Sequence, residues 1–545
     1  MKKYLVFFLT FFLFNLSASA THFMGGEITW ECLKSGPDEG KYVFQMKIYS
    51  DCSSFSFSQI PQTLVHHNYP SLGGDSPILM NFISVTDISP TGTAASGNTC
   101  FTCANGDVGA VEEYIFESDP IFLVGSPPAE GWHFTWGSCC RSGVISNIVQ
   151  SSTFGSEAIT LRSVMYPYTD AASGIIFPTD SCYDNSPEFR ELAKTMICTG
   201  SPFAYSDNAS DQELDEISYS WGEPLGDNVN YDPSNPSSTA IPFLSPYSVA
   251  SPIPGNPTLD SQTGEIAFSP NTTGTFVTCV KVEARKCGQI VAEIYRESQV
   301  VLLACPTSTN GMVNNSPTIT APLGSQIWNN TINSAGLPSY STTVTAGELI
   351  SFSLDGEDLD MYNNITPQDL TMTISGEPLS SDYINPLLCA HPPCATFTEL
   401  GGSPPPIVFA SLVSGVFEWQ TSSDHITTNG CNNPFSVFVF SIKVHDDFCP
   451  VNGVSIATIK ITIEPLTTGI EDQLSHFAIY PNPINDVLYI EVDYDAVQIF
   501  DILGSSLLQS DKQSEINVSH LSVGAYIIEL KIANKSVRKK LQISR

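Results

Sequence analysis

The chain has 545 residues, and this length predicts several domains, because a single hydrophobic core stops growing at about half that size. Only 14% of the residues are charged, while glycine and proline are frequent, with 37 and 38 copies, which favours an all-β chain of short strands and turns. The formal net charge of −34 argues against nucleic acid as a partner, because phosphate binding needs a basic surface.

Residues 1–20 have the pattern of a secretory signal peptide. Two lysines come directly after the initiator, an apolar stretch runs from Tyr4 to Leu16, and Ala18-Ser19-Ala20 supplies the small residues of a cleavage site. The stretch is too short for a stable membrane anchor, and no later stretch approaches the ~20 apolar residues of a spanning helix. We therefore expect an exported chain with no transmembrane segment after signal cleavage.

Residues 21–195 predict a β-rich N-terminal domain. Trp132, Phe134 and Trp136 alternate in the sequence, which places them on one face of a strand. Four segments, taken in order, resemble the N-terminal region of large Bacteroidota surface proteins that are described mostly as gliding-motility-associated: THFMGGEITWECL, YVFQMKIYSDCSS, WHFTWGSCCRSGVISNI and CYDNSPEF. The resemblance extends to about residue 306, and it implies extracellular β-modules but no particular activity.

Residues 196–306 and 317–465 repeat one scheme, with a polar linker at residues 310–317 between them. Each unit has an acidic loop after an early strand and a Gly-x-Phe strand before a closing hairpin, which indicates an internal repeat of β-sandwiches. Both units resemble immunoglobulin-like or cadherin-like sandwiches. A second short polar linker, residues 466–474, leads to the C-terminal unit.

The acidic loops of these two units are candidate calcium sites. Carboxylates on alternate residues let one loop wrap a Ca²⁺ ion, which takes six to eight oxygen ligands at ~2.3–2.6 Å. Cadherin-like modules often bind calcium at such loops, so the resemblance points the same way. The alternative is a pair of solvated acidic turns. The candidate ligands are Asp207, Asp211, Glu213 and Asp215 in the first loop and Asp355, Glu357, Asp358 and Asp360 in the second, with Asp446 and Asp447 near the far hairpin.

Residues 470–545 alternate short apolar runs with turns, which predicts a small β-sandwich. Four ordered motifs resemble the type A C-terminal sorting domain of the type IX secretion system: Tyr480-Pro481-Asn482-Pro483, the strand and turn that end at Gly504, the segment Leu521–Tyr526 with Gly524, and Lys539-Lys540 in the last strand. The family usually has a basic residue where this chain has Ser505. The resemblance implies the type IX machinery as a partner, delivery to the cell surface or the medium, and a source among the Bacteroidota.

Fifteen cysteines follow the signal peptide, and in an exported chain they are disulfide candidates first. Adjacent Cys139 and Cys140 are each expected to have a distant partner, and the odd total leaves one thiol free or paired outside the chain. The alternative is a zinc site made by Cys100, Cys103, Cys139 and Cys140. The two pairs close enough in sequence to form local loops are Cys100 with Cys103 and Cys389 with Cys394.

No catalytic site is predicted, because the sequence contains neither His-Glu-x-x-His nor Gly-x-Ser-x-Gly. We expect a secreted or cell-surface binding or structural protein, adhesin-like, whose unknown extracellular ligand is a glycan or a surface protein. Two alternatives stay open. One is a carbohydrate-active or proteolytic accessory exoprotein, which needs paired carboxylates ~5–9.5 Å apart or a nucleophile–base pair. The other is a component of the surface gliding machinery.

Overall fold

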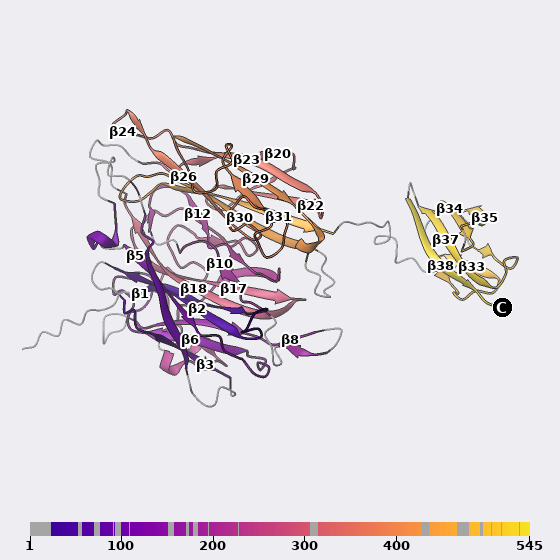
Figure 1. Cartoon of the computed structure of the whole chain (residues 1–545), viewed down its shortest axis with the longest axis horizontal. Helices are drawn as coiled ribbons and strands as arrows, with labels where there is room; N and C mark the ends of the chain where they lie inside the picture. Colours follow the sequence, from indigo (N-terminus) through magenta and orange to yellow (C-terminus); the bar gives the residue numbers. More distant parts are fainter. Residues whose placement is uncertain are drawn as a thin grey trace, which may run out of the picture. The chain divides into compact units, whose positions relative to one another are not determined.

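The structure is a computed structural model that divides into two compact units, residues 1–465 and 466–545, which we call the body and the tail domain (Figure 1). The signal peptide and the linker at residues 466–474 lie outside the residues that the structure describes. Those residues are 23–52, 57–69, 77–90, 92, 100–107, 110–150, 157–170, 174–177, 184–193, 196–226, 228–305, 314–426, 435–465, 479–490, 494–502, 504–513, 515–532 and 535–545.

One eleven-stranded sheet runs through the N-terminal part of the body. Its strands are β1 (Phe23–Cys32), β2 (Tyr42–Asp51), β3 (Gln62–His67), β4 (Ile78–Asp87), β5 (Val111–Ser118), β6 (Trp132–Ser138), β7 (Ile159–Met165), β11 (Met196–Cys198), β14 (Glu216–Trp221), β17 (Gly274–Lys286) and β18 (Gln289–Leu303). The main path is β1-β2-β5-β4-β3-β6-β7-β18-β17-β14, and β11 pairs with β18. Because β1 also pairs with β18, the stretch of the sheet from β1 to β18 closes on itself.

Two glycines make this closure possible. Gly25 lies opposite Ser298, and Gly26 lies opposite Glu297. A Cβ atom on Gly25 would lie 1.9 Å from the main-chain oxygen of Glu297, and one on Gly26 would lie 2.4 Å from that of Lys47. A side chain at Gly25 would force β1 away from β18, and one at Gly26 would force it away from β2, so the pair of glycines lets β1 contact strands on both of its sides.

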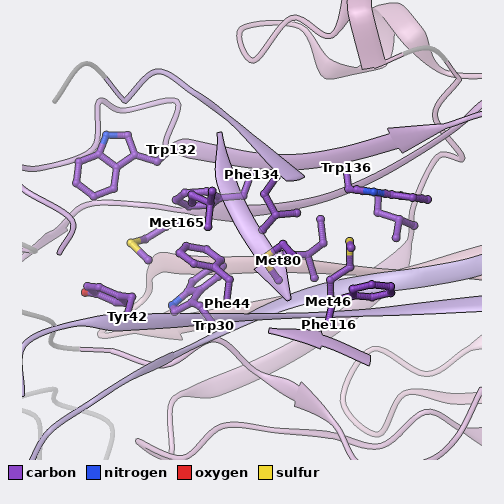
Figure 2. Packing of buried hydrophobic residues seen from close by; sticks show 14 of the residues in the cluster. Trp30, Tyr42, Phe44, Met46, Met80, Phe116, Trp132, Phe134, Trp136 and Met165 are labelled. Atoms are coloured by element: carbon purple, nitrogen blue, oxygen red, sulfur yellow. The ribbon is translucent and has the colours of Figure 1, made fainter. Parts of the chain in front are cut away.

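The closed part of the sheet surrounds an aromatic core (Figure 2). Trp132, Phe134 and Trp136 of β6 all point into it, as their alternation predicts, and they are 1%, 0% and 3% exposed. Phe44 packs against Phe134 with ring centroids 4.5 Å apart. Each such ring buries a large apolar area, so the rings contribute strongly to the stability of the core.

Residues 196–303 form a second core on the same sheet. The three-stranded sheet of β12 (Phe203–Ser206), β16 (Glu265–Phe268) and β15 (Thr258–Leu259) shares a cluster of buried side chains with β14, β17 and β18. The long strands β17 and β18 therefore contribute to both cores. The sheet continues across the expected boundary between residues 195 and 196, and Phe189 before that boundary belongs to the second core, so the boundary stays a prediction. Two short ladders complete this part: β8 (Tyr168–Thr169) with β9 (Ile176–Phe177), and β10 (Glu188–Phe189) with β13 (Ala209–Ser210).

Residues 318–464 form a two-sheet sandwich. One sheet has β19 (Thr318–Ile319), β20 (Leu323–Gly324), β23 (Leu349–Glu357), β29 (Leu412–Gln420) and β27 (Thr396–Thr398). The other has β21 (Asn329–Ile332), β22 (Pro338–Thr345), β31 (Val454–Glu464), β30 (Ser436–His445), β26 (Asp369–Ser375) and β28 (Ile407–Ala410), and β24 (Met361–Tyr362) pairs with β25 (Thr366–Pro367). Burial alternates along β23 and β29, as expected for strands with one face on a core, and Trp419 is completely buried.

This sandwich contacts the 196–303 region directly. Val454 is buried in the core of residues 196–303. The Glu265 carboxylate accepts hydrogen bonds from Asn333 at 2.8 Å, from the Ser339 hydroxyl at 3.0 Å and from the Thr458 hydroxyl at 2.5 Å. The body is therefore joined through buried polar and apolar contacts as well as through its chain connection.

The tail domain is a small sandwich, as the sequence predicts. One sheet has β32 (Ile479–Tyr480), β33 (Val487–Ile490) and β36 (Ile516–Asn517), and the other has β35 (Ser506–Asp511), β34 (Ala496–Phe500), β37 (Gly524–Ile532) and β38 (Lys535–Ile543). Together with the body, it makes this an all-β, multidomain protein of β-sandwich type. Among the residues that the structure describes, none lies in a helix with the length and apolarity that a bilayer crossing requires.

Candidate functional sites

The Pro481-Asn482-Pro483 motif covers one edge of the tail domain. The Asn482 side chain donates to the Lys540 carbonyl at 3.1 Å and accepts from the Gln542 N–H at 2.9 Å. The Ile484 N–H donates to the Gln542 carbonyl at 2.8 Å. These bonds use main-chain groups of β38 that an edge strand otherwise exposes, and the prolines cannot donate to a further strand.

Gly504 lies in a turn between two strands, and Gly524 lies at the start of a strand. Gly504 has φ +88 in the turn between β34 and β35, where glycine is favoured, and its N–H donates to the Asp501 carbonyl at 3.1 Å. The Asp501 side chain accepts from the Ser505 N–H at 2.8 Å. Because that bond uses the main chain of Ser505, the turn does not need the basic side chain that the family usually has there. Gly524 begins β37.

A shallow groove of about 360 Å³ lies on the four-stranded sheet of the tail domain. Arg538 beside it pairs with Glu529 at 2.5 Å, and its guanidinium lies 5.6 Å from the centre of the Phe500 ring. Lys539 and Lys540, the basic pair of the sorting motif, lie along the same strand. The residues that line the groove are Ile502, Ala525, Tyr526, Ile527, Arg538, Lys539 and Lys540.

The first acidic loop is paired with cations of the protein itself. Asp207 is buried and lies 3.1 Å from the Arg296 guanidinium, which also pairs with buried Glu27. Glu213 pairs with Lys34. The ammonium group of buried Lys286 lies 3.0 Å from Asp215 and 2.8 Å from Asp184. Asp184 was not singled out by the sequence analysis. Paired charges in this arrangement relieve much of the repulsion that a calcium ion would otherwise relieve.

Asp211 closes the first loop on itself. Its Oδ1 accepts the N–H of Glu213 at 2.9 Å and that of Asp215 at 3.1 Å. Burial raises the pKa of the Asp211 carboxyl well above its usual range, and the neighbouring Asp215 carboxylate adds to this effect. Asp207, Asp211 and Asp215 are 4%, 3% and 6% exposed, so the alternative of a solvated turn does not describe this loop.

The structure separates the four candidates of the second loop. Asp355 lies on β23 and accepts the Ser414 hydroxyl at 2.5 Å, while Glu357 at the end of the same strand is exposed. Asp358 is 6% exposed, and its Oδ1 accepts the Asp360 N–H at 2.8 Å. Asp360 accepts the Asn315 N–H at 2.7 Å.

Asp358 and Asp360 instead lie beside Asp446, Asn314 and Gln368, a group that we call the second acidic cluster. Asp446 is fully buried and accepts the Asn314 amide at 2.7 Å and the Gly453 N–H at 3.0 Å, and Asn314 in turn accepts from Gln368 at 2.8 Å. Burial raises the pKa of Asp446 to about 8, helped by the Asp358 charge, and raises that of Asp358 to about 6.

Two buried oxygens of this cluster lack a hydrogen-bond partner. They are Asp358 Oδ2 and Gln368 Oε1. Asp447 is separate from the cluster, because it accepts the Tyr362 hydroxyl at 2.8 Å and the Asp369 N–H at 3.0 Å. Over the described part of the chain, no group of three or more His, Cys, Asp or Glu side chains is arranged to hold a metal ion. The calcium sites therefore stay a prediction.

The disulfides differ from the local pairing expected for Cys100 and Cys103. Cys52 bonds to Cys103, and Cys100 bonds to Cys449, across 349 residues, so one short loop is tied both to β2 and to the C-terminal sandwich. The expectation of distant partners for Cys139 and Cys140 was also wrong, because these two bond to each other. The zinc alternative fails for the same reason, since its four thiols are used in disulfides.

Two further cysteine predictions have clear outcomes, and one further bridge was not predicted. The local Cys389–Cys394 bridge is confirmed. Cys198 bonds to Cys305, which closes the 196–306 region near its expected ends. Cys279 is a buried free thiol, as the odd total predicts, and burial raises its pKa to about 12. Such a thiol is inert, so it has a structural role.

A cluster of exposed apolar side chains, which we call the apolar tip, lies at one end of the C-terminal sandwich. Main-chain hydrogen bonds join its segments: the Asp358 N–H donates to Ser411, and the Ser411 N–H donates to Gln368. Sequence reasoning missed the tip, because its residues come from strand ends that are distant in the chain. Its members are Leu359 (76% exposed), Met361 (39%), Ile365 (81%), Val408 (49%), Phe409 (52%) and Leu412 (52%).

Comparison with known proteins identifies the tail domain. Residues 478–544 match the family model of the secretion system C-terminal sorting domain. The protein is therefore a cargo of the type IX secretion system, and it is delivered to the cell surface or the extracellular space. The match covers the tail domain and leaves the body unassigned. No curated protein matches the chain.

Solved structures with similar features include multidomain immunoglobulin-type proteins. The N-terminal four Ig domains of Dscam1 isoform 4.4 are 8% identical, with 93% of this chain and 95% of that chain covered and a TM-score of 0.18. Extracellular domains 3–5 of Drosophila OTK are 12% identical, with 67% and 97% covered and a TM-score of 0.15. HBP35 of Porphyromonas gingivalis is 14% identical, with 43% and 66% covered and a TM-score of 0.11. These TM-scores are too low to support any argument about domain arrangement.

Proposed function

We propose that this protein is an adhesin-like surface protein whose body binds an extracellular ligand after type IX export. The apolar tip is the observation that carries the proposal. Single exposed apolar side chains are common on soluble proteins, but a contiguous group of them marks an interaction site. Six such side chains lie here on segments that main-chain pairing joins, at one end of a sandwich that is tied to the rest of the body by the Cys100–Cys449 disulfide.

A firmly held sandwich suits a binding role. Side chains on a fixed scaffold lose little freedom when a ligand binds, so less of the contact energy is used for ordering. The ligand that fits the tip best is a protein or glycan with an apolar face, because the tip offers large aliphatic and aromatic side chains. The alternatives, an accessory hydrolase and a gliding component, have no comparable surface feature in their favour.

The test is binding of the mature full-length chain to whole cells and to a glycan array. Phe409→Ser combined with Ile365→Ser should lower binding at least tenfold, because both side chains are largely exposed and contribute little to the core. Ile327→Ser is the matched control, since Ile327 is 87% exposed and lies outside the tip. Equal binding by all three proteins would show that the ligand contacts another surface.

We also propose that the second acidic cluster is where calcium acts on the body. One difference from the first loop supports this choice. Three carboxylates of the first loop, Asp207, Asp215 and Glu213, already have Arg296, Lys286 and Lys34 as partners. The buried Asp358 Oδ2 and Gln368 Oε1 of the second cluster have no hydrogen-bond partner, as is also true of Asp211 Oδ2 in the first loop, and a hard cation prefers oxygens of this kind.

A further inference from the structure

One face of the tail domain combines apolar side chains with positive charge. In the register of its sheet, Ile527 lies between Phe500 on β34 and Lys540 on β38. Ile527 is 37% exposed and the neighbouring Ile502 is 74% exposed. Together with Ala525 and Arg538 these residues form the surface that we call the basic-apolar face, and the groove of about 360 Å³ lies on it.

The positive charge of the tail domain is concentrated in its last fifteen residues. Of the seven Lys and Arg residues in segment 470–545, six lie in residues 531–545, where there is no Asp or Glu. On the face itself, Arg538 is paired with Glu529. Lys540 is exposed and, within the described part of the tail domain, has no ion-pair partner. The cation is therefore available to a carboxylate of another molecule.

The sheet edge next to the groove is not available for strand pairing. Asn482 occupies the Lys540 carbonyl and the Gln542 N–H, and Ile484 occupies the Gln542 carbonyl. A partner that reaches the groove must therefore contact the side chains of the face, and cannot extend the sheet along this part of β38.

We propose that the basic-apolar face is the surface by which the type IX machinery holds the tail domain, and that its occupant is a protein surface with carboxylates around an apolar side chain. The partner needs carboxylates because the face carries positive charge, and it needs an apolar side chain among them because the groove has an apolar lining. The inference rests on the export role of the tail domain, and it does not depend on the adhesin-like role of the body.

The test is export of the full-length chain in a type IX-competent host, measured as the ratio of surface and medium protein to periplasmic protein. Ile527→Asp and Lys540→Glu should each lower this ratio at least tenfold, because each places a carboxylate against the acidic occupant. Lys540→Arg keeps the charge and should export normally. Tyr489→Asp is the control, since Tyr489 is 36% exposed on the other sheet.

Each result decides a different point. Normal export of both face variants overturns the proposal, and so does an equal loss in Tyr489→Asp. Loss of binding to phosphatidylglycerol vesicles in Lys540→Glu, with normal export, would assign the face to a lipid surface and also overturn it. Variants that stay in the periplasm must melt within about 2 °C of the parent protein. A loss of about 1 kcal/mol would shift the melting temperature of a small domain by several degrees, so this agreement excludes unfolding as the cause of the export defect. A chain without residues 466–545 should stay in the periplasm, and if it does not, the export role itself fails.

Discussion

Removal of the Cys100–Cys449 bridge should be the most damaging disulfide change in the body. The bridge joins residues 349 apart, and it ties the loop at residues 100–107 to the hairpin between β30 and β31. Cys100→Ser with Cys449→Ser leaves the neighbouring Cys52–Cys103 bridge in place. The variant therefore removes the covalent link to the C-terminal sandwich and keeps the one to β2.

The magnitude follows from loop closure in the unfolded chain. The Cys198–Cys305 bridge lies within the same stretch and shortens the covalent path between Cys100 and Cys449 to about 240 residues, for which the chain-entropy model gives about 5.5 kcal/mol as an upper limit. The Cys389–Cys394 bridge closes a separation of 5 residues, and the same model gives about 2 kcal/mol. The long bridge should therefore contribute more than twice as much as the short one.

Guanidinium unfolding of the mature chain, followed by tryptophan fluorescence, measures the difference. Trp419 reports on the C-terminal sandwich, and Trp132 and Trp136 report on the aromatic core. We expect the transition of the sandwich to move to lower denaturant in the long-bridge variant by more than twice the shift caused by Cys389→Ser with Cys394→Ser. Equal shifts, or a non-reduced peptide map without a Cys100–Cys449 fragment, would refute the reasoning.

Three further predictions concern charged groups of the body. Millimolar Ca²⁺ should raise the melting temperature of the mature chain, because binding at a hundredfold excess over Kd stabilises the folded state by about 2.7 kcal/mol. Asp358→Ala with Asp360→Ala should remove this rise, and Glu357→Ala, at an exposed carboxylate, should keep it. If the parent protein shows no rise, the second acidic cluster has a structural role only. Stability without calcium should fall as pH rises from about 4 to 8, because burial raises the pKa of Asp358 to about 6 and that of Asp446 to about 8, so the folded chain holds more protons than the unfolded chain in this window. Asp446→Asn should flatten the high-pH part of the plot of stability against pH. If the stability of the parent protein rises with pH in that part, the raised pKa values of Asp358 and Asp446 do not control it. Arg296→Met should cost about 3–5 kcal/mol in chemical unfolding, because it leaves buried Asp207 without a cation and buried Glu27 with Lys47 alone, at 3.5 Å. Lys41→Met, at the more exposed pair with Asp38, should cost less than about 1 kcal/mol. Similar losses in the two variants would contradict the importance of the buried network.

Local patterns in the sequence were sufficient for the tail domain and for the aromatic face of β6. Trp132, Phe134 and Trp136 alternate with a period of two, and burial of one strand face produces that period. The turn at Gly504 and the edge cover at Asn482 depend on residues close to each other in the chain or on a motif with a fixed order. Both are signals that a single sequence carries.

Long-range pairings carried no such signal. Cys100 has Cys103 three residues away and Cys449 at a distance of 349, and nothing in the spacing favours the distant partner. The same holds for Lys286, whose position between Asp184 and Asp215 turns an apparent metal loop into a set of ion pairs. An acidic loop looks the same in the sequence whether a metal ion or a lysine from another strand neutralises it.

The closure of the sheet between β1 and β18 imposes an order on folding. β1 is among the first parts of the chain to be synthesised, yet Glu27 on β1 and its partner Arg296 on β18 are 269 residues apart. Contacts of such high contact order form slowly, and a strand that waits for its neighbour exposes an edge on which chains aggregate. The body can therefore complete its first core only after almost three hundred residues have crossed the inner membrane, and until then the early strands have to be kept apart from those of other chains.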